Sequence, residues 1–158
     1  MLSVPWWTID QALAQAGDIA GRIVIDTCNQ FSRDGVLTLP GQITAAAYNA
    51  SRMPGARYTK SFNTLTAAFQ AEAAGRLDDQ RVVQWLCGDD LEAKATVSAL
   101  IKDAGYAPAD VGGTATCQVM EAPRRPGSVY GEEYRPSDAA AVLAAVQAGL
   151  PIPPAPHY

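Results

Sequence analysis

The chain has 158 residues, of which 12 are Lys or Arg and 16 are Asp or Glu, so its formal charge is −4 at pH 7. Its 48% apolar and 18% charged residues are typical of a soluble folded domain. The acidic balance excludes the basic face that a nucleic-acid partner needs. Because no apolar run approaches the roughly 20 residues of a membrane helix and no secretion leader is recognisable, we expect a cytoplasmic protein with no membrane partner.

Cysteine and histidine usage argues against metal and hydrolase chemistry. Cys28, Cys87 and Cys117 lack CxxC spacing, which is typical of reduced thiols rather than a disulfide framework. The single histidine, His157, lies next to the C-terminus in a Pro-rich tail. A zinc site needs clustered Cys and His, and a Ser-His or Cys-His pair would have to recruit that tail. We therefore expect no bound metal.

In chain order, short apolar β-branched runs alternate with Ala-rich helical patterns. The runs predict strands at 1–4, 22–26, 56–61, 80–87 and 109–111, and the Ala-rich segments predict helices at 8–16, 43–51, 64–74, from Asp89 to Gly105, and 136–148. The segment 29–41 is interpreted as a loop because Gly35, Pro40 and Gly41 interrupt it. This alternation predicts a three-layer α/β fold with a mostly parallel sheet of about four or five strands.

Ligands bind at the carboxyl ends of the strands in open parallel sheets. That rule selects four loops as candidate site segments: 5–7, 27–29, 63–64 and 88–90. Asp89 and Asp90 are most simply helix caps, because carboxylates there accept hydrogen bonds from free N–H groups of the first turn.

Five strings in and around these loops are distinctive, and in order along the chain they are VPWW at 4–7, IVIDTCNQF at 23–31, GARYTKSFNTL at 55–65, CGDDLEAKATVSALIKDAGYAPADVGG at 87–113 and TATCQVMEAP at 114–123. Together they resemble one family, the NADP-dependent deazaflavin-coenzyme reductases. The resemblance implies a Rossmann-like domain over residues 1–122, with a C-terminal loop, helix and Pro-rich tail at 123–158 packing on it.

The resemblance also implies a function and a site. It implies an oxidoreductase in which hydride passes between stacked rings of NADP and a deazaflavin, with Pro5, Trp6, Asn29 and Asn63 as cofactor-binding residues. The family's GxGxxG unit would precede VPWW and has no counterpart in these residues. We therefore expect a truncated Rossmann-like fold, and dinucleotide binding by this chain is in question because the glycine loop holds the pyrophosphate.

Each candidate residue also has a structural interpretation. Trp6 is equally well explained as a core or interface anchor, Asn29 as a turn residue and Asn63 as the N-cap of the following helix. Lys60 and Glu121 are the candidate catalytic residues. Lys60 would meet a phosphate or oxyanion, or else form an ion pair on the rim of the sheet, and Glu121 would act as a general acid in a dry pocket.

Two other functions remain open, and one assembly is expected. The chain is alternatively a cofactor-independent cyclase, isomerase or dehydratase acting on a small hydrophobic substrate, or a non-catalytic partner subunit. Without a preceding βαβ unit, the edge of the first strand is open, and open edges recruit partners. We therefore expect a small-molecule substrate and a homodimer formed through the N-terminal strand edge or the Trp6–Trp7 face.

Overall fold

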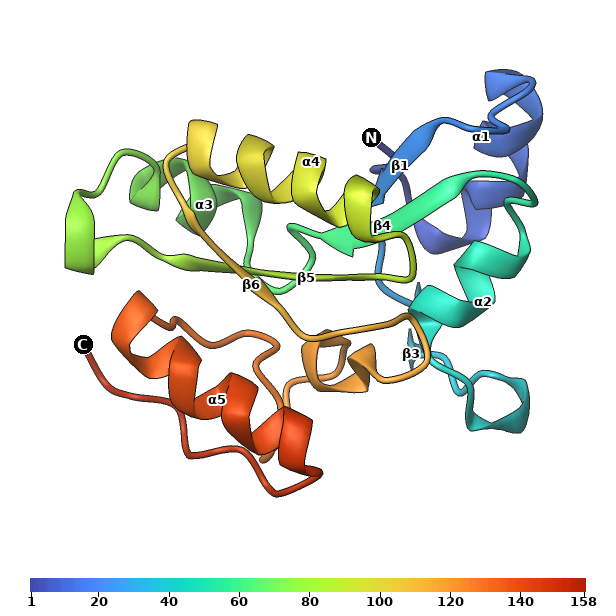
Figure 1. Ribbon diagram of the computed structural model, residues 1–158. Helices are drawn as coiled ribbons and strands as arrows, with labels where there is room; N and C mark the ends of the chain where they lie inside the picture. Colours follow the sequence, from blue (N-terminus) through green and yellow to red (C-terminus); the bar gives the residue numbers. More distant parts are fainter.

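The computed structural model describes residues 1–158, and a four-stranded sheet in the order β1-β4-β5-β6 forms its centre (Figure 1). The strands are β1 (Ile23–Asp26), β4 (Arg57–Ser61), β5 (Val83–Gly88) and β6 (Ala107–Asp110). The pairs β1–β4 and β5–β6 are parallel, whereas β4–β5 is antiparallel. The expected α/β fold with a mostly parallel sheet is confirmed.

Both faces of the sheet are buried, as the continuous apolar runs of β5 require. Successive side chains of a strand point to opposite faces, and Val83, Trp85 and Cys87 accordingly belong to one apolar core while Leu86 belongs to the other. The smaller core is covered by α3 (Ala67–Ala73) and α4 (Leu91–Asp103). The larger core is covered by α1 (Ile9–Ala16), α2 (Ala45–Ser51) and α5 (Pro136–Ala148).

The reversed direction of β5 corrects one expectation about the strand ends. Thr59 pairs with Gly88 and Ser61 with Leu86, so β5 ends beside the start of β4. The loop 88–90 therefore lies at the opposite end of the strands from loops 27–29 and 63–64. The expectation that these loops share one edge was wrong for 88–90, because the apolar pattern of a strand carries no information about its direction.

The structure confirms one predicted helix cap, Asp90, and shows that Asp89 and Asn63 are not caps. Asp90 caps α4, its Oδ1 accepting from Ala93 N at 2.9 Å. Asp89 is not a cap and accepts instead from the backbone N–H and hydroxyl of Thr114. Thr66, not Asn63, caps α3.

The segment 29–41 contains more structure than the expected loop. A small hairpin joins β2 (Phe31–Ser32) to β3 (Gly35–Val36), and the 3-10 turn η2 (Pro40–Gln42) follows it. Three further 3-10 turns complete the elements: η1 (Trp6–Thr8), η3 (Asp78–Gln80) and η4 (Cys117–Met120). The longest helices have 13 residues and are too short and polar to cross a bilayer.

The C-terminal segment packs against the sheet below β5 and β6 (Figure 1). Tyr134 lies edge-on to Trp85 with ring centroids 5.4 Å apart, and its carbonyl accepts from Val83 N at 2.8 Å. At the other side of the sheet, Leu2 makes a single parallel bridge to β1, with Leu2 N donating to Ile25 O at 2.8 Å. The expected homodimer through this edge stays a prediction.

Candidate functional site

A cavity of about 510 Å³ lies at the carboxyl ends of the parallel strands β1 and β4, and we call it the sheet-end pocket. This is the position at which open α/β sheets bind their ligands. The residues that line it come from the two strand ends, from the start of α3 and from the segment before α5: Thr27, Asn29, Phe62, Asn63, Thr64, Leu65, Thr66, Phe69, Tyr130, Gly131 and Glu133.

Two of the predicted cofactor-binding residues meet in this pocket. Asn63 Nδ2 donates to Asn29 Oδ1 at 3.1 Å and to Met120 O at 2.7 Å, and Asn29 Nδ2 donates to Asn63 O at 2.8 Å. Because two acceptors face Asn63 Nδ2, the orientation of this amide is fixed by its surroundings. The pairing follows from the parallel register of β1 and β4, which brings the residues after both strands to one edge.

Two buried polar atoms at this pocket have no partner within the chain: Asn63 Oδ1 and Thr64 Oγ1. The side chains of Asn63 and Thr64 are only 4% and 2% exposed. A buried polar atom without a hydrogen bond costs about 1–3 kcal/mol, so native proteins rarely leave one unpaired without a reason. A ligand with hydrogen-bond donors would satisfy both atoms.

Aromatic side chains form apolar walls of the sheet-end pocket. Phe62, Phe69 and Tyr130 line it, and Phe62 adopts φ 58°, in the left-handed region that non-glycine residues seldom occupy. Such backbone conformations are concentrated at functional sites. Glu133 is the one charged residue of the lining, and Arg76 Nη1 neutralises it at 2.9 Å. The pocket therefore suits a flat, neutral ring rather than a phosphate.

Beneath these loops lies a buried polar centre formed by Asp26, Asn49, Tyr58 and Lys60. Asp26 Oδ2 accepts from Asn49 Nδ2 at 2.8 Å and from the Tyr58 hydroxyl at 2.5 Å, and it lies 3.5 Å from Lys60 Nζ. Lys60 Nζ also donates to the carbonyl of Cys28, while Asp26 Oδ1 accepts from Cys28 N at 2.8 Å. The buried ion pair thus holds both backbone polar groups of one residue, Cys28, in the loop that carries Asn29.

Within this ion pair, Asp26 and Lys60 each shift the pKa of the other in the direction that favours its charged form. Burial acts to raise the pKa of Asp26, but the Lys60 charge and hydrogen bonds from Asn49, Tyr58 and Cys28 lower it overall. Burial acts to lower the pKa of Lys60, but Asp26 and Glu121 raise it overall. Burial and the neighbouring Asp26 charge raise the pKa of the Cys28 thiol to about 11. Asp26 and Lys60 are therefore charged near neutral pH, and Cys28 is a neutral thiol.

The two predicted catalytic residues lie apart from the sheet-end pocket. Lys60 is fully buried within the polar centre, so its ion pair lies inside the protein rather than on the rim. Both carboxylate oxygens of Glu121 accept from the backbone at the start of α2, from Ala46 N at 2.7 Å and from Ala45 N at 2.8 Å. Their catalytic roles stay predictions, and the geometry gives both residues structural partners.

Pro5 and Trp6, the other predicted cofactor-binding residues, do not line the sheet-end pocket. Trp6 is buried and stacks on Tyr48, with ring centroids 5.9 Å apart, and the Arg52 guanidinium lies over both rings. Pro5 is exposed and precedes η1. This packing within the larger core agrees with the core-anchor interpretation of Trp6, and the cofactor-binding roles of Pro5 and Trp6 stay predictions.

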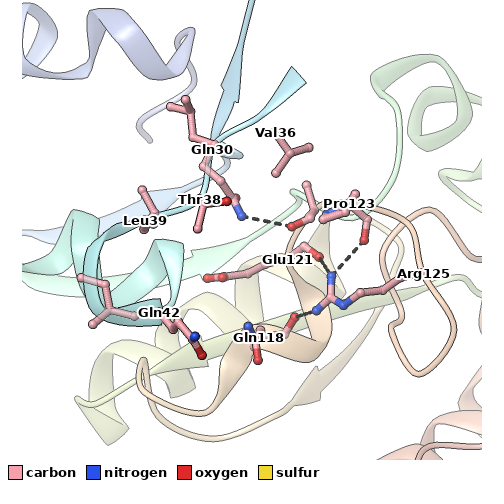
Figure 2. A pocket seen from close by; sticks show the side chains of 12 residues that line it. Gln30, Val36, Thr38, Leu39, Gln42, Gln118, Glu121, Pro123 and Arg125 are labelled. Carbon is pink, nitrogen blue, oxygen red and sulfur yellow. Dashed lines mark hydrogen bonds between the residues drawn. The ribbon is translucent and has the colours of Figure 1, made fainter. Parts of the chain in front are cut away.

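A second cavity, of about 430 Å³, lies below the β2–β3 hairpin, and we call it the hairpin pocket (Figure 2). The residues that line it are Gln30, Val36, Leu37, Thr38, Leu39, Gln42, Ile43, Gln118, Glu121, Ala122, Pro123 and Arg125. Gln30 Nε2 donates to Ala122 O at 3.0 Å. Since Asn29 faces the sheet-end pocket and Gln30 the hairpin pocket, adjacent residues of one loop form part of both sites.

Comparisons with known proteins agree with this architecture. No family model matches the chain. Over 107 residues, which are 68% of this chain and 21% of the relative, the sequence is 36% identical to the Metalloreductase STEAP3 of Rattus norvegicus. Among solved structures, the protein SMa0349 of Sinorhizobium meliloti superposes with a TM-score of 0.73 at 28% identity, over 85% of this chain and 64% of that chain.

A further solved structure is a protein of Arthrobacter sp. FB24 described as an F420-dependent NADP reductase, with a TM-score of 0.60 and 24% identity over 73% of this chain and 56% of that one. The chain spans about a fifth of the length of the curated relative that it matches. The similarities confirm the Rossmann-like fold and support an oxidoreductase-like family, whereas the more specific relation to a truncated deazaflavin-coenzyme reductase stays a prediction.

Several residues of the site were missed at the level of sequence. Asp26 ends a predicted strand, and its register partner in β4 is Lys60, so a charged residue at the end of an apolar run was the available signal. Thr64 lay within the candidate loop 63–64 but was not singled out as a site residue. Phe69 and Glu133 had none, because their place in the pocket depends on how α3 and the segment before α5 pack.

Proposed function

We propose that the chain is an oxidoreductase of the NADP/deazaflavin reductase type, in which the sheet-end pocket holds the nicotinamide ring. The observation that carries the proposal is the pair of unpartnered buried atoms, Asn63 Oδ1 and Thr64 Oγ1, at the carboxyl edge of β1 and β4. The relation to reductases supports the same reaction class.

The residues of the pocket fit the ring end of such a cofactor. Asn63 Oδ1 would accept from the carboxamide N–H₂ group, and Thr64 Oγ1 would accept or donate at the same edge. Phe62, Phe69 and Tyr130 would hold the ring flat and exclude water from one side. When bound, the reduced nicotinamide supplies a hydride, which carries two electrons to an acceptor ring, and solvent supplies the balancing proton.

The phosphates of the cofactor do not fit the same pocket. Its one charged residue is the acidic Glu133, and the chain contains no GxGxxG motif that would present backbone N–H groups to a pyrophosphate. Any anchoring of the phosphates would therefore lie outside the sheet-end pocket, and the expected affinity rests mainly on the ring.

Cofactor-independent chemistry finds less support. A cyclase, isomerase or dehydratase would need a free acid or base beside its substrate. Lys60 Nζ is held by Asp26 and the Cys28 carbonyl, and both Glu121 oxygens are held by backbone N–H groups. Neither group is available without breaking these contacts.

The test is calorimetric titration of the full chain with NADPH, with Thr64→Val as the variant. Valine keeps the shape of threonine and removes the hydroxyl, so it should weaken NADPH binding about tenfold while leaving the fold intact. Thr96→Val, on the exposed face of α4, is the matched control and should bind like the wild type. Absence of binding at about 1 mM NADPH, the upper range of ordinary KM values, would contradict the proposal.

A further inference from the structure

The side chain of Asn29 makes both of its hydrogen bonds to a single neighbour, Asn63. Its Nδ2 donates to the Asn63 carbonyl at 2.8 Å, and its Oδ1 accepts from Asn63 Nδ2 at 3.1 Å. The two residues follow the adjacent parallel strands β1 and β4, so they meet at one end of the sheet. Asn29 therefore differs from Asn63, whose Oδ1 has no partner within the chain.

These contacts determine which atom of the Asn63 amide is left free. A backbone carbonyl only accepts hydrogen bonds, so the Asn63 carbonyl requires the Nδ2 of Asn29 beside it, and the Oδ1 of Asn29 then faces Asn63 Nδ2. The Met120 carbonyl accepts from the same Nδ2 at 2.7 Å. If the Asn63 amide were turned over, its oxygen would face two acceptors. The fold therefore keeps the nitrogen engaged and leaves the acceptor Oδ1 for a ligand.

The position of Asn29 is set in turn by the buried polar centre. Asp26 Oδ1 accepts from Cys28 N at 2.8 Å, and Lys60 Nζ donates to the Cys28 carbonyl. Both backbone polar groups of the residue before Asn29 are thus held by charged side chains that are 0% exposed. Hydrogen bonds to charged groups are stronger than those between neutral groups. The loop that carries Asn29 therefore cannot shift without breaking contacts inside the core.

We propose that Asn29 is a positioning residue, which acts through Asn63 and makes the sheet-end pocket selective for a ring that carries a hydrogen-bond donor. This inference rests on the proposed nicotinamide site. Asn63 Oδ1, held in place by Asn29, accepts from the N–H₂ group of a carboxamide but finds no donor on a ring with an acetyl group in its place. A site built to accept a hydrogen bond rejects the analogue that lacks the donor, because its buried acceptor stays unpaired.

The probes are NADPH and its reduced 3-acetylpyridine analogue, in which a methyl group replaces the amide nitrogen. Calorimetric titration of the full chain gives the ratio of their dissociation constants. We expect the wild type to bind NADPH at least about tenfold more tightly than the analogue, and Asn29→Leu, which removes both hydrogen bonds, to reduce this preference to about threefold or less. Gln147→Leu, at an exposed position of α5, is the matched control and should keep the wild-type ratio. Because a ratio cancels a general loss of affinity or stability, a merely structural role of Asn29 would leave it unchanged.

A second measurement does not require NADPH. Asn63 Nδ2 donates two hydrogen bonds in a residue that is 4% exposed, so hydrogen exchange of this side-chain amide, followed by nitrogen-15 NMR, should be at least about tenfold faster in Asn29→Leu than in the wild type. The proposal is overturned if the wild type binds both compounds equally, if folded Asn29→Leu keeps the wild-type ratio, or if the Asn63 amide exchanges at the same rate in both proteins.

Two further outcomes are separable. If the wild type does not bind NADPH, the proposed function fails, and the exchange of the Asn63 amide alone decides whether Asn29 positions it. If Asn29→Leu does not fold, Asn29→Ala takes its place in both measurements, because it also removes both hydrogen bonds and adds no bulk at this half-buried position.

Discussion

The sheet-end pocket and the buried polar centre lie at the same end of β1 and β4, but they differ in whether their buried polar atoms have hydrogen-bond partners. In the polar centre, Asp26 has hydrogen bonds or an ion pair on both oxygens. In the pocket, Asn63 Oδ1 and Thr64 Oγ1 have none. Burial alone therefore does not distinguish the two sets of groups in this chain, whereas their hydrogen-bond partners do.

The contrast has a physical basis. A buried charge is tolerated only when partners compensate its lost hydration, so the centre must be complete before any ligand arrives. A neutral amide or hydroxyl costs much less when unpaired, so the fold can carry it until a ligand supplies the partner. The predictions below test each side of this contrast.

The largest expected effect is the loss of the buried ion pair. Lys60→Met leaves Asp26 charged, buried and without its cation, and should lower the free energy of unfolding by about 3–5 kcal/mol. Urea denaturation measures it, and the exposed Lys102→Met variant serves as a control with little change. A loss below about 1 kcal/mol would show that the centre is not structural.

Glu121→Ala should produce the next largest change. It removes the acceptor for two buried backbone N–H groups at the start of α2 and should cost about 2–3 kcal/mol. Glu72→Ala, at an exposed position of α3, should have almost no effect. If Glu121→Ala instead keeps full stability and abolishes NADPH oxidation, the prediction of a catalytic acid is supported over the structural interpretation.

The pH dependence of stability should reflect the same centre. The pKa of Cys28 is raised to about 11 in the folded state, so the unfolded chain releases this proton first, and stability should fall by about 2 kcal/mol as the pH rises from about 9 toward 11. The Asp26 pKa is lowered, so its contribution is present above the ordinary value of about 4 and is lost as the pH falls further. Denaturation across pH measures both, and Cys28→Ala should flatten only the alkaline side.

The smallest effect has the opposite sign. Thr64→Val removes an unpartnered buried hydroxyl and should raise the free energy of unfolding by about 1 kcal/mol in the absence of ligand. Differential scanning calorimetry measures the shift. Together with weaker NADPH binding, a more stable variant would show that the hydroxyl is kept for a ligand. A clear destabilisation would mean that Thr64 has an unrecognised structural role.

Much of the fold was predictable because it depends on local patterns. Apolar runs located the four strands to within a few residues, and Asp90 was recognisable as a cap because its position before an apolar helix leaves few alternatives. The meeting of Asn29 and Asn63 followed from strand ends in a parallel pair. These features require only the chain direction and the side-chain period.

What sequence could not supply depends on tertiary packing. The direction of β5 is invisible in a run in which both faces are buried. Lys60 gave no sign that its partner would be buried with it, because the register that places Asp26 opposite is set by the pairing of β1 and β4. The role of Glu121 likewise depends on the approach of η4 to α2, two segments distant in the chain.

Because β4 pairs with β5 in the antiparallel direction, the loop after β5 lies at the opposite end of the strands from both pockets. Arg57 and Asp90 form a bidentate ion pair at the end opposite both pockets, with Arg57 Nε 2.6 Å from Asp90 Oδ2. A fluorophore, an affinity handle or a surface linkage attached near that end, for instance at the exposed Glu92, would leave both cavities open to titration. The reversed direction of β5 thus provides an attachment site at the end of the strands that lies away from both pockets.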